Sequence, residues 1–271
     1  MNISLGNWDS DPFTSRTPRI VNAAKLHRAA ARNKSERFLV EGFNSVDAAL
    51  RADAAYEVFV TETAIDRYSS LLEGARAPIS LIDDSAARAL AETVTSTGLF
   101  AVCDADAALS SVDEVIARGV DAGVLVVPVE CSDPGNVGTI IRMSDALGAG
   151  GVLLAGDSVD PLGGKAVRSS AGSIFNVPVA RERDVDAVLS ALHDAGFATL
   201  ATCMDGAVVL GKDELPTGHI AWLFGNEAHG LSDEVVAKSS HSVSIPIRGG
   251  AESLNLATAA AMCLWEFARA R

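Results

Sequence analysis

Short apolar segments alternate with helical segments through the second half of the chain, and this alternation limits the fold more than any other feature. The apolar segments, which we expect to be strands, are 124–128, 151–155, 198–202, 220–224 and 243–246. Helices are expected between them at 137–147 and 185–195. Because strands buried on both faces read as nearly continuous apolar runs, the pattern predicts a parallel sheet covered by helices on both sides.

The first half of the chain shows a second, smaller alternation. Strands are expected at 38–40, 57–60, 79–82 and 99–103, and helices at 18–33, 45–51, 64–72 and 84–93. We therefore expect an α/β protein with a small α/β domain over residues 1–105. An acidic, alanine-rich linker over 106–121 then leads to the larger α/β domain over 122–271.

Composition excludes several classes of protein. The 271 residues are 48% hydrophobic, yet no run of 18 apolar residues is present, so no transmembrane helix is expected. Residues 1–9 lack a basic region and an apolar core, so no signal peptide is expected. The four cysteines and five histidines are scattered without metal-ligand spacing. These features favour a cytoplasmic protein with reduced thiols and no bound metal.

Charge is distributed unevenly along this acidic chain. The formal net charge is −13, but the segment 16–37 contains seven basic residues and a single acidic one. A basic segment on an acidic protein favours local binding of a polyanion. A solvated amphipathic helix would explain the same segment. The candidate polyanion contacts are Arg28, Arg32, Lys34 and Arg37.

Polar turns follow three of the expected strands, at 133–142, 223–231 and 243–256. Ligands of parallel α/β sheets bind beyond the carboxyl ends of the strands, so these three junctions are expected to form one composite site. In the first, Asn136 opens a helix that carries Arg142 about two turns later. In the second, glycines flank Glu227, and in the third, Ser253 and Asn255 precede a long apolar helix.

The common cofactor and nucleophile motifs are missing. No Gly-x-Gly-x-x-Gly fingerprint follows a strand, and neither a P-loop nor a Gly-x-Ser-x-Gly elbow is present. The turn Gly163-Gly164-Lys165 matches none of them. These absences argue against a standard dehydrogenase, kinase or serine hydrolase.

Taken together, the three junctions resemble the signature motifs of the SpoU (TrmH) family of RNA ribose 2′-O-methyltransferases. The resemblance covers 122–271, including the stretch 165–175 between the first two motifs. Residues 18–103 resemble more loosely the L30e-like substrate-binding domain found in many members, through 37–42 and 93–98. One departure is Gly164, which stands where many relatives carry proline.

The resemblance implies a fold and a cofactor that residue patterns alone do not give. It implies a parallel SPOUT sheet with a deep C-terminal trefoil knot, S-adenosylmethionine as the cofactor, and a homodimer formed through the C-terminal domain. The positions that match the cofactor site are Leu223, Gly225, Asn226, Ile245 and Leu254. The apolar face that would form the dimer interface is Leu256, Ala260, Cys263, Leu264 and Phe267. The alternative is that this face packs within its own chain.

The resemblance also implies a reaction, transfer of a methyl group to a ribose 2′-hydroxyl of structured RNA. The residues implied at the catalytic site are Arg142, Asn136, Glu227, Ser253 and Asn255. We expect Arg142 to orient the phosphate and the 2′-oxygen, with its role as a base left open, because free-base arginine is rare. Ribosomal RNA, specifically 23S, is the preferred substrate and transfer RNA the alternative. A catalytically silent RNA-binding or ribosome-assembly factor and a nucleotide-dependent oxidoreductase remain competing interpretations.

Overall fold

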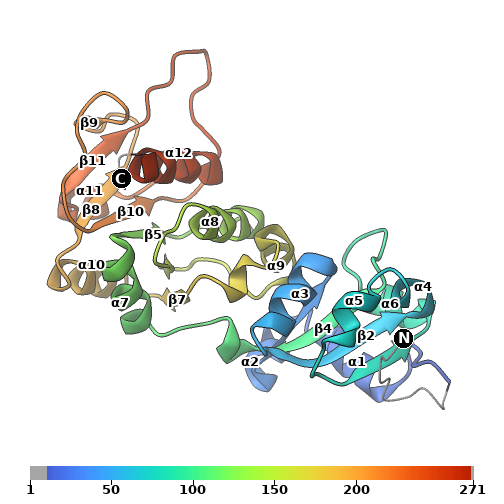
Figure 1. The fold of residues 1–271 in the computed structure, drawn as a ribbon. Coiled ribbons are helices and arrows are strands. Elements are labelled where there is room, and N and C mark those ends of the chain that lie inside the picture. Colours follow the sequence, from blue (N-terminus) through green and yellow to red (C-terminus); the bar gives the residue numbers. More distant parts are fainter. Residues whose placement is uncertain (1–10, 270–271) are drawn as a thin grey trace. The chain divides into compact units, whose positions relative to one another are not determined.

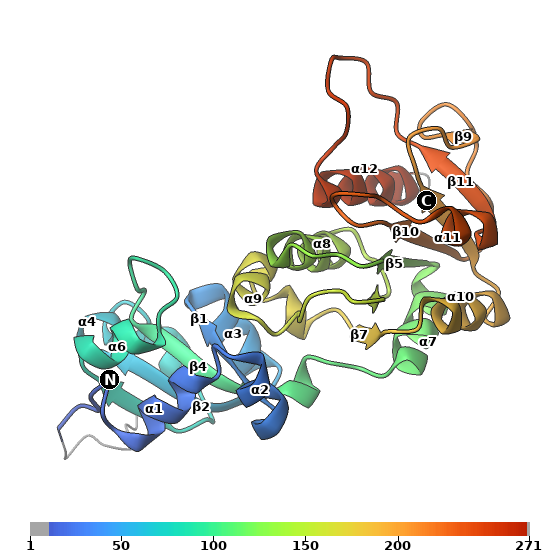
Figure 2. The ribbon, with the colours of Figure 1, turned by 180° about the vertical axis from the view of Figure 1, so that it is seen from behind.

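The structure is a computed structural model that describes residues 11–269, so the N-terminal segment considered for a signal peptide lies outside it. The chain forms two compact units (Figures 1 and 2). The first contains the residues up to Ala108 together with Leu162–Asn176. The second contains Leu109–Pro161 and the chain from Val177 onward. The mixed α/β class predicted from the sequence is confirmed.

The first unit is built on a four-stranded sheet of order β1-β4-β2-β3, in which only the β2–β3 pair is parallel. Its strands are β1 (Arg37–Glu41), β2 (Ala55–Thr61), β3 (Ile79–Ile82) and β4 (Leu99–Asp104). Its helices are α1 (Pro18–Lys25), α2 (Ala29–Ser35), α3 (Phe43–Arg51), α4 (Glu62–Ile65), α5 (Ser69–Glu73), α6 (Asp84–Leu90) and α9 (Gly164–Ser170), with 3₁₀ turns at Ala105–Ala107 and Ser173–Phe175. One apolar core joins α1 and α6 to the sheet through Ile20, Phe59 and Phe100.

The expected helix over 18–33 is wrong in one respect, because the chain breaks it into α1 and α2. Arg28 has an extended backbone (φ −98°, ψ 130°) at the start of α2. The Arg32 guanidinium donates hydrogen bonds to the carbonyls of Leu26 (2.8 Å) and His27 (3.1 Å). These carbonyls lie at the end of α1, where no intrahelical donor reaches them. Arg32 therefore stabilises the break and is itself buried, with 7% of its surface exposed.

The second unit is built on a seven-stranded sheet of order β7-β6-β5-β10-β8-β11-β9. Every strand pair in its described part is parallel, as predicted from the apolar runs. Its strands are β5 (Val124–Pro128), β6 (Val152–Ala155), β7 (Val179–Glu182), β8 (Ala198–Thr202), β9 (Val208–Val209), β10 (Ile220–Phe224) and β11 (His241–Ser244). Its helices are α7 (Val112–Ala122), α8 (Pro134–Ala146), α10 (Val185–Asp194), α11 (Asp233–Lys238) and α12 (Leu256–Arg269).

Strands β5 and β10 lie side by side at the centre of this sheet, with Val127 opposite Leu223 and Pro128 opposite Phe224. All ten residues of the two strands are buried. Because both strands run in the same direction, the turns that follow them emerge at the same edge. The loop after β11 extends away from the sheet before the chain enters α12 (Figure 1).

The segment 162–176 connects β6 to β7 in sequence but packs in the first unit. Phe175 stacks on Phe38 of β1, with ring centroids 5.7 Å apart. Gly172 packs so closely that a Cβ there would lie 2.7 Å from the carbonyl oxygen of Asn44. These contacts account for the assignment of α9 to the first unit, which the sequence did not predict.

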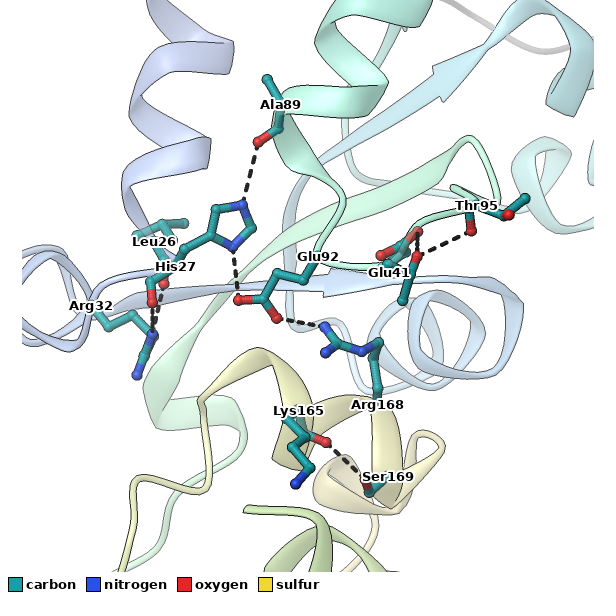
Figure 3. A network of polar contacts seen from close by, with 11 residues as sticks. Leu26, His27, Arg32, Glu41, Ala89, Glu92, Thr95, Lys165, Arg168 and Ser169 are labelled. Carbon is teal, nitrogen blue, oxygen red and sulfur yellow. Dashed lines mark hydrogen bonds and ion pairs between the residues drawn. The ribbon is translucent and has the colours of Figure 1, made fainter. Parts of the chain in front are cut away.

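A charged cluster of His27, Glu92 and Arg168 attaches α9 to this unit (Figure 3). Glu92 Oε1 lies 3.3 Å from His27 Nδ1, and Glu92 Oε2 lies 2.5 Å from Arg168 Nη1. The other ring nitrogen of His27 is 3.3 Å from the carbonyl oxygen of Ala89. A Cβ at position 164 would overlap Glu92 Oε2, so glycine makes room for the carboxylate.

Candidate active site

The turn between β5 and α8 contributes the first part of the candidate site. Asp133 is the N-cap of α8, and its side chain accepts a hydrogen bond from the backbone N–H of Asn136 (3.0 Å). Pro134 occupies the first turn, where its missing N–H costs nothing. The cap is thus Asp133, which leaves the Asn136 side chain free to bridge other segments. Asn136 is 8% exposed.

Glu227 lies in the turn after β10, and its carboxylate accepts hydrogen bonds from several residues of the β5–α8 turn. Oε1 accepts from Cys131 Sγ (3.1 Å), Asp133 N (3.0 Å) and Asn136 Nδ2 (3.0 Å). Oε2 accepts from the backbone N–H (3.0 Å) and the hydroxyl (2.8 Å) of Ser132. Partial desolvation opposes the charge of this exposed residue, but hydrogen bonds led by that of Asn136 outweigh it and hold the pKa of Glu227 well below its usual range. Glu227 is therefore an ionised acceptor that organises this turn.

The third junction joins the same network through Asn255. Asn255 Nδ2 donates to Asn136 Oδ1 (2.9 Å), and Asn255 Oδ1 accepts from the backbone N–H of Thr258 (3.2 Å) in the first turn of α12. Polar side chains from positions 136, 227 and 255 are thus connected in one chain of hydrogen bonds. The sequence predicted that these three junctions would meet, and the structure brings them together.

Arg142 and Ser253 stand apart from this network. Arg142 lies on α8 two turns beyond Asn136 and is exposed. Among residues 11–269, no side chain or carbonyl forms an ion pair or hydrogen bond with its guanidinium. Ser253 is exposed in the loop before α12. Arg142 is therefore available to a ligand that approaches from solvent.

The positions matched to a cofactor site divide into buried and open groups. Leu223 and Gly225 are buried, and a Cβ on Gly225 would overlap the backbone of residues 230–231. Asn226 fixes the turn, since its Nδ2 donates to the carbonyl of Glu130 (2.7 Å). Ile245 is half-buried, and Leu254 is 36% exposed.

The loop 246–254 fits a ligand that is recognised by backbone groups. Within the described part of the chain, its amides and carbonyls form no hydrogen bonds with other residues. Gly249 and Gly250 face open space, because a Cβ on either would meet nothing within 4 Å. Free backbone donors and acceptors beside Ile245 and Leu254 suit a molecule with an apolar ring and polar edges.

The four basic residues predicted to contact a polyanion have different environments. Arg28 and Lys34 are exposed. Arg37 pairs with Asp104 (3.0 Å), and its guanidinium lies 3.3 Å above the centre of the Tyr56 ring. Arg32 is buried and bound to carbonyl oxygens, as described above. We therefore restrict the candidate contacts in this segment to Arg28 and Lys34.

Two residues of the network were missed by the sequence reasoning. Cys131 and Ser132 both donate to Glu227, which is more than 90 residues away in sequence. Their position directly before the Asp133 cap was the only available signal. No residue pattern indicates that a thiol and a carboxylate so far apart will meet.

The apolar face of α12 was considered as a dimer interface, but part of it is buried within its own chain. Ala260, Cys263 and Leu264 are buried within their own chain, and α12 packs on α8 and β10. The large apolar side chains that remain exposed on this helix are Met262 (41%) and Trp265 (60%). For Ala260, Cys263 and Leu264 the alternative holds, in which this face packs within its own chain.

Two further observations concern metal ions and membranes. Residues 11–269 contain no group of three or more His, Cys, Asp or Glu side chains that could hold a metal ion. Over the same range, every helix is too short or too polar to cross a membrane. The fold and the network define an α/β protein with a polar ligand site at the carboxyl edge of a parallel sheet.

Comparison with known proteins identifies the family. The SpoU rRNA Methylase family matches residues 123–265, and an MRM3-like substrate binding domain matches residues 17–101. The chain belongs to the SpoU rRNA Methylase family, as its three junctions predicted.

Relatives of similar length extend the match over nearly the whole chain. The 23S rRNA (guanosine(2553)-2′-O)-methyltransferase RlmP of Bacillus subtilis is 29% identical over 93% of this chain and 96% of its own. An AdoMet-bound rRNA methyltransferase from Sinorhizobium meliloti superposes with a TM-score of 0.82 at 25% identity, covering 96% of this chain and 97% of its own. The SpoU methyltransferase AviRb from Streptomyces viridochromogenes gives a TM-score of 0.81 at 28% identity, covering 93% and 97%.

Proposed function

We propose that this protein transfers the methyl group of S-adenosylmethionine to a ribose 2′-hydroxyl of structured RNA, with 23S ribosomal RNA as the substrate. The observation that carries the proposal is the hydrogen-bonded chain from Glu227 through Asn136 to Asn255, which unites the three motifs of the family in one site. RlmP and AviRb, similar over almost the full length, support the choice of ribosomal RNA. A cytoplasmic location follows from that substrate.

The residues of this chain have separate tasks in the proposed reaction. S-adenosylmethionine, when bound, supplies an electrophilic methyl group, so the protein chiefly needs to align the ribose oxygen with it. The exposed guanidinium of Arg142 is free to hold an RNA phosphate and to polarise the 2′-hydroxyl. Ser253 and Asn255 would position the ribose, while ionised Glu227 holds Asn136 and Asn255 in orientation.

The cofactor would be held by the loop 246–254 and the turn after β10. The free backbone groups of that loop, with Ile245 and Leu254 beside them, are suited to the adenosine part. Buried Leu223 and Gly225 would support the turn from below. The deep trefoil knot known from the family belongs to this proposal as well.

RNA capture and dimerisation complete the proposal. We assign the first unit to RNA binding and the second unit to catalysis; the second unit includes α7, most of which lies within the stretch 106–121 expected to be a linker. Arg28 and Lys34 are the candidate phosphate contacts because both are exposed. For the homodimer we propose the exposed pair Met262 and Trp265, since large apolar side chains on one helix face favour contact with a second copy.

The proposal is tested with tritiated S-adenosylmethionine and total ribosomal or transfer RNA. We expect label in ribosomal RNA, and we expect Arg142→Ala to reduce transfer at least about 100-fold while calorimetry shows nearly unchanged cofactor binding. Arg118→Ala, which removes an exposed arginine from α7, is the matched control. Near-normal transfer by Arg142→Ala would show that our role for Arg142 is wrong. Binding of cofactor and RNA without transfer by the wild type would identify a silent RNA-binding factor instead.

A further inference from the structure

We propose that Cys131 is a positioning residue for the methyl transfer, acting through Glu227. The inference rests on the function proposed above. Cys131 lies just after β5, three residues before α8 begins, and its residue surface is fully buried. Its thiol donates a hydrogen bond to Glu227 Oε1 (3.1 Å).

The thiol shares its acceptor atom with the amide that continues the network. Glu227 Oε1 accepts from Cys131 Sγ at 3.1 Å and from Asn136 Nδ2 at 3.0 Å. The second oxygen, Oε2, accepts from the backbone N–H and the hydroxyl of Ser132. A change at the thiol therefore acts on the oxygen that holds Asn136, whereas a change at Ser132 acts first on the other oxygen.

The proton in this contact belongs to sulfur. Burial, reinforced by the neighbouring Glu227 carboxylate, raises the pKa of the Cys131 thiol far above its usual value. The thiol is therefore a donor at neutral pH, and ionised Glu227 can only accept. The backbone of Cys131 is itself fixed, because its N–H donates to Ser158 Oγ (3.0 Å), which donates to the carbonyl of Ala155 (2.8 Å).

This arrangement determines which end of each side-chain amide donates and which accepts. Since Glu227 only accepts, Asn136 must present its NH₂ group to it and its carbonyl oxygen to Asn255. Asn255 then directs its own oxygen to the first turn of α12. By holding Oε1 in place, the thiol helps to fix the orientation of both amides, and with them the side chain proposed to meet the ribose.

Loss of the thiol should therefore slow the chemical step and spare binding. We expect Cys131→Ala to lower kcat about 10-fold, the effect of losing one hydrogen bond to a charged group, with KM for cofactor and RNA within about 2-fold. Cys131→Ser keeps a donor at this position and should restore kcat to within about 3-fold of wild type. Cys131→Val fills the space without a donor and should remain slow.

The control is Cys103→Ala, which removes a fully buried thiol from β4 of the first unit. Thermal unfolding of every variant separates a general loss of stability from an effect on kcat. The contact itself is measured without any activity, from the infrared S–H stretching band that disappears in Cys131→Ala. We expect this band at low frequency in the wild type, as for a thiol bound to an anion, and at higher frequency in Glu227→Gln.

The outcomes are distinct. If the wild type transfers methyl groups and Cys131→Ala or Cys131→Val has the same kcat, the positioning role of Cys131 is overturned. The proposed function of the protein would then still stand. An S–H band unaffected by Glu227→Gln would overturn the contact on which the role depends. Absence of transfer by the wild type to any RNA would overturn the proposed function, and with it the role of Cys131 in that reaction.

Discussion

Two carboxylates, one in each unit, hold distant segments of the chain together, and they do so with opposite kinds of partner. Glu92 is held in the first unit by the ionisable side chains of His27 and Arg168. Glu227 is held in the second unit by two backbone amides, an amide side chain, a hydroxyl and a thiol. No cation contacts Glu227 among residues 11–269.

The difference shows how a charge can be fixed with or without a counter-charge. An ion pair such as Glu92–Arg168 depends on ionic strength and tolerates changes of geometry. A carboxylate bound by several neutral donors depends on the position of each donor but hardly on salt. The second arrangement suits a site where a cation must stay free for the ligand, and Arg142 is such a cation.

The largest expected effect on methyl transfer comes from removing Glu227, the carboxylate that is bound by neutral donors. Glu227→Ala leaves five donors without their acceptor and frees Asn136 and Asn255, so transfer to RNA should fall about 100-fold or more, as for a site displaced by about 1 Å. The measurement is the rate of tritium transfer at saturating substrates. Glu92→Ala, the matched change in the first unit, should reduce kcat much less. Equal losses of kcat would contradict the distinction between the two carboxylates.

The next effect concerns the space that Gly164 leaves for Glu92. Gly164→Ala puts a Cβ onto the carboxylate, so the flexible Glu92 side chain must turn away and give up its contacts with His27 and Arg168, which should cost about 1–2 kcal/mol in the packing of 162–176. Hydrogen exchange of amides 164–170 measures this directly. The control Gly74→Ala has room, with only one atom near the added Cβ, at 3.9 Å. The double variant Glu92→Ser/Gly164→Ala should recover part of the protection, and no recovery would mean that Glu92 is not what the new methyl group meets.

A smaller effect is expected from the charge pair itself. A double-mutant cycle with Glu92→Gln and Arg168→Gln should give a coupling of about 1 kcal/mol at low salt. Both side chains are about 30% exposed, so 1 M NaCl should reduce the coupling substantially. The cost of Glu227→Gln, measured in the same two salt concentrations, should hardly change. If the cost of Glu227→Gln changed with salt concentration, an unrecognised cation would lie near that carboxylate.

The smallest effect is a pH dependence of stability. The folded-state pKa of Glu227 lies below its unfolded value of about 4.3, so the carboxylate contributes stability that is fully present above that pH. This contribution is lost as the pH falls towards the folded-state pKa. The melting temperatures of the wild type and Glu227→Gln should therefore differ by a constant amount from pH 6 to 8 and converge below about pH 4. A difference that grows on acidification would contradict an ionised Glu227.

Much of the second unit could be predicted because its strands are apolar on both faces. Runs such as 124–128 and 220–224 indicate buried parallel strands, and the site follows from the rule that ligands bind where such strands end. Asn136, Glu227 and Asn255 were found in this way. The short strand β7 and the helix α9 were missed, since neither four mixed residues nor a glycine-rich turn produces a clear period.

What could not be predicted depends on contacts between distant residues. Arg32 looked like its basic neighbours in sequence, and only the break between α1 and α2 gives its guanidinium two carbonyl partners. The unusual glycine at 164 was visible, but the carboxylate that lies beside it comes from Glu92, 72 positions earlier. Cys131 looked like an ordinary core residue until the turn after β10 brought Glu227 to its sulfur.

The placement of 162–176 has a practical consequence for anyone dividing the protein. The connection from β6 to β7 carries Val167, Ile174 and Phe175 into the core of the first unit, so no single cut yields two self-sufficient halves. A fragment starting at residue 109 would display these side chains to water and should aggregate. A fragment ending at residue 108 would leave Phe38 uncovered. Gene fusions and truncations should therefore keep both units in one polypeptide.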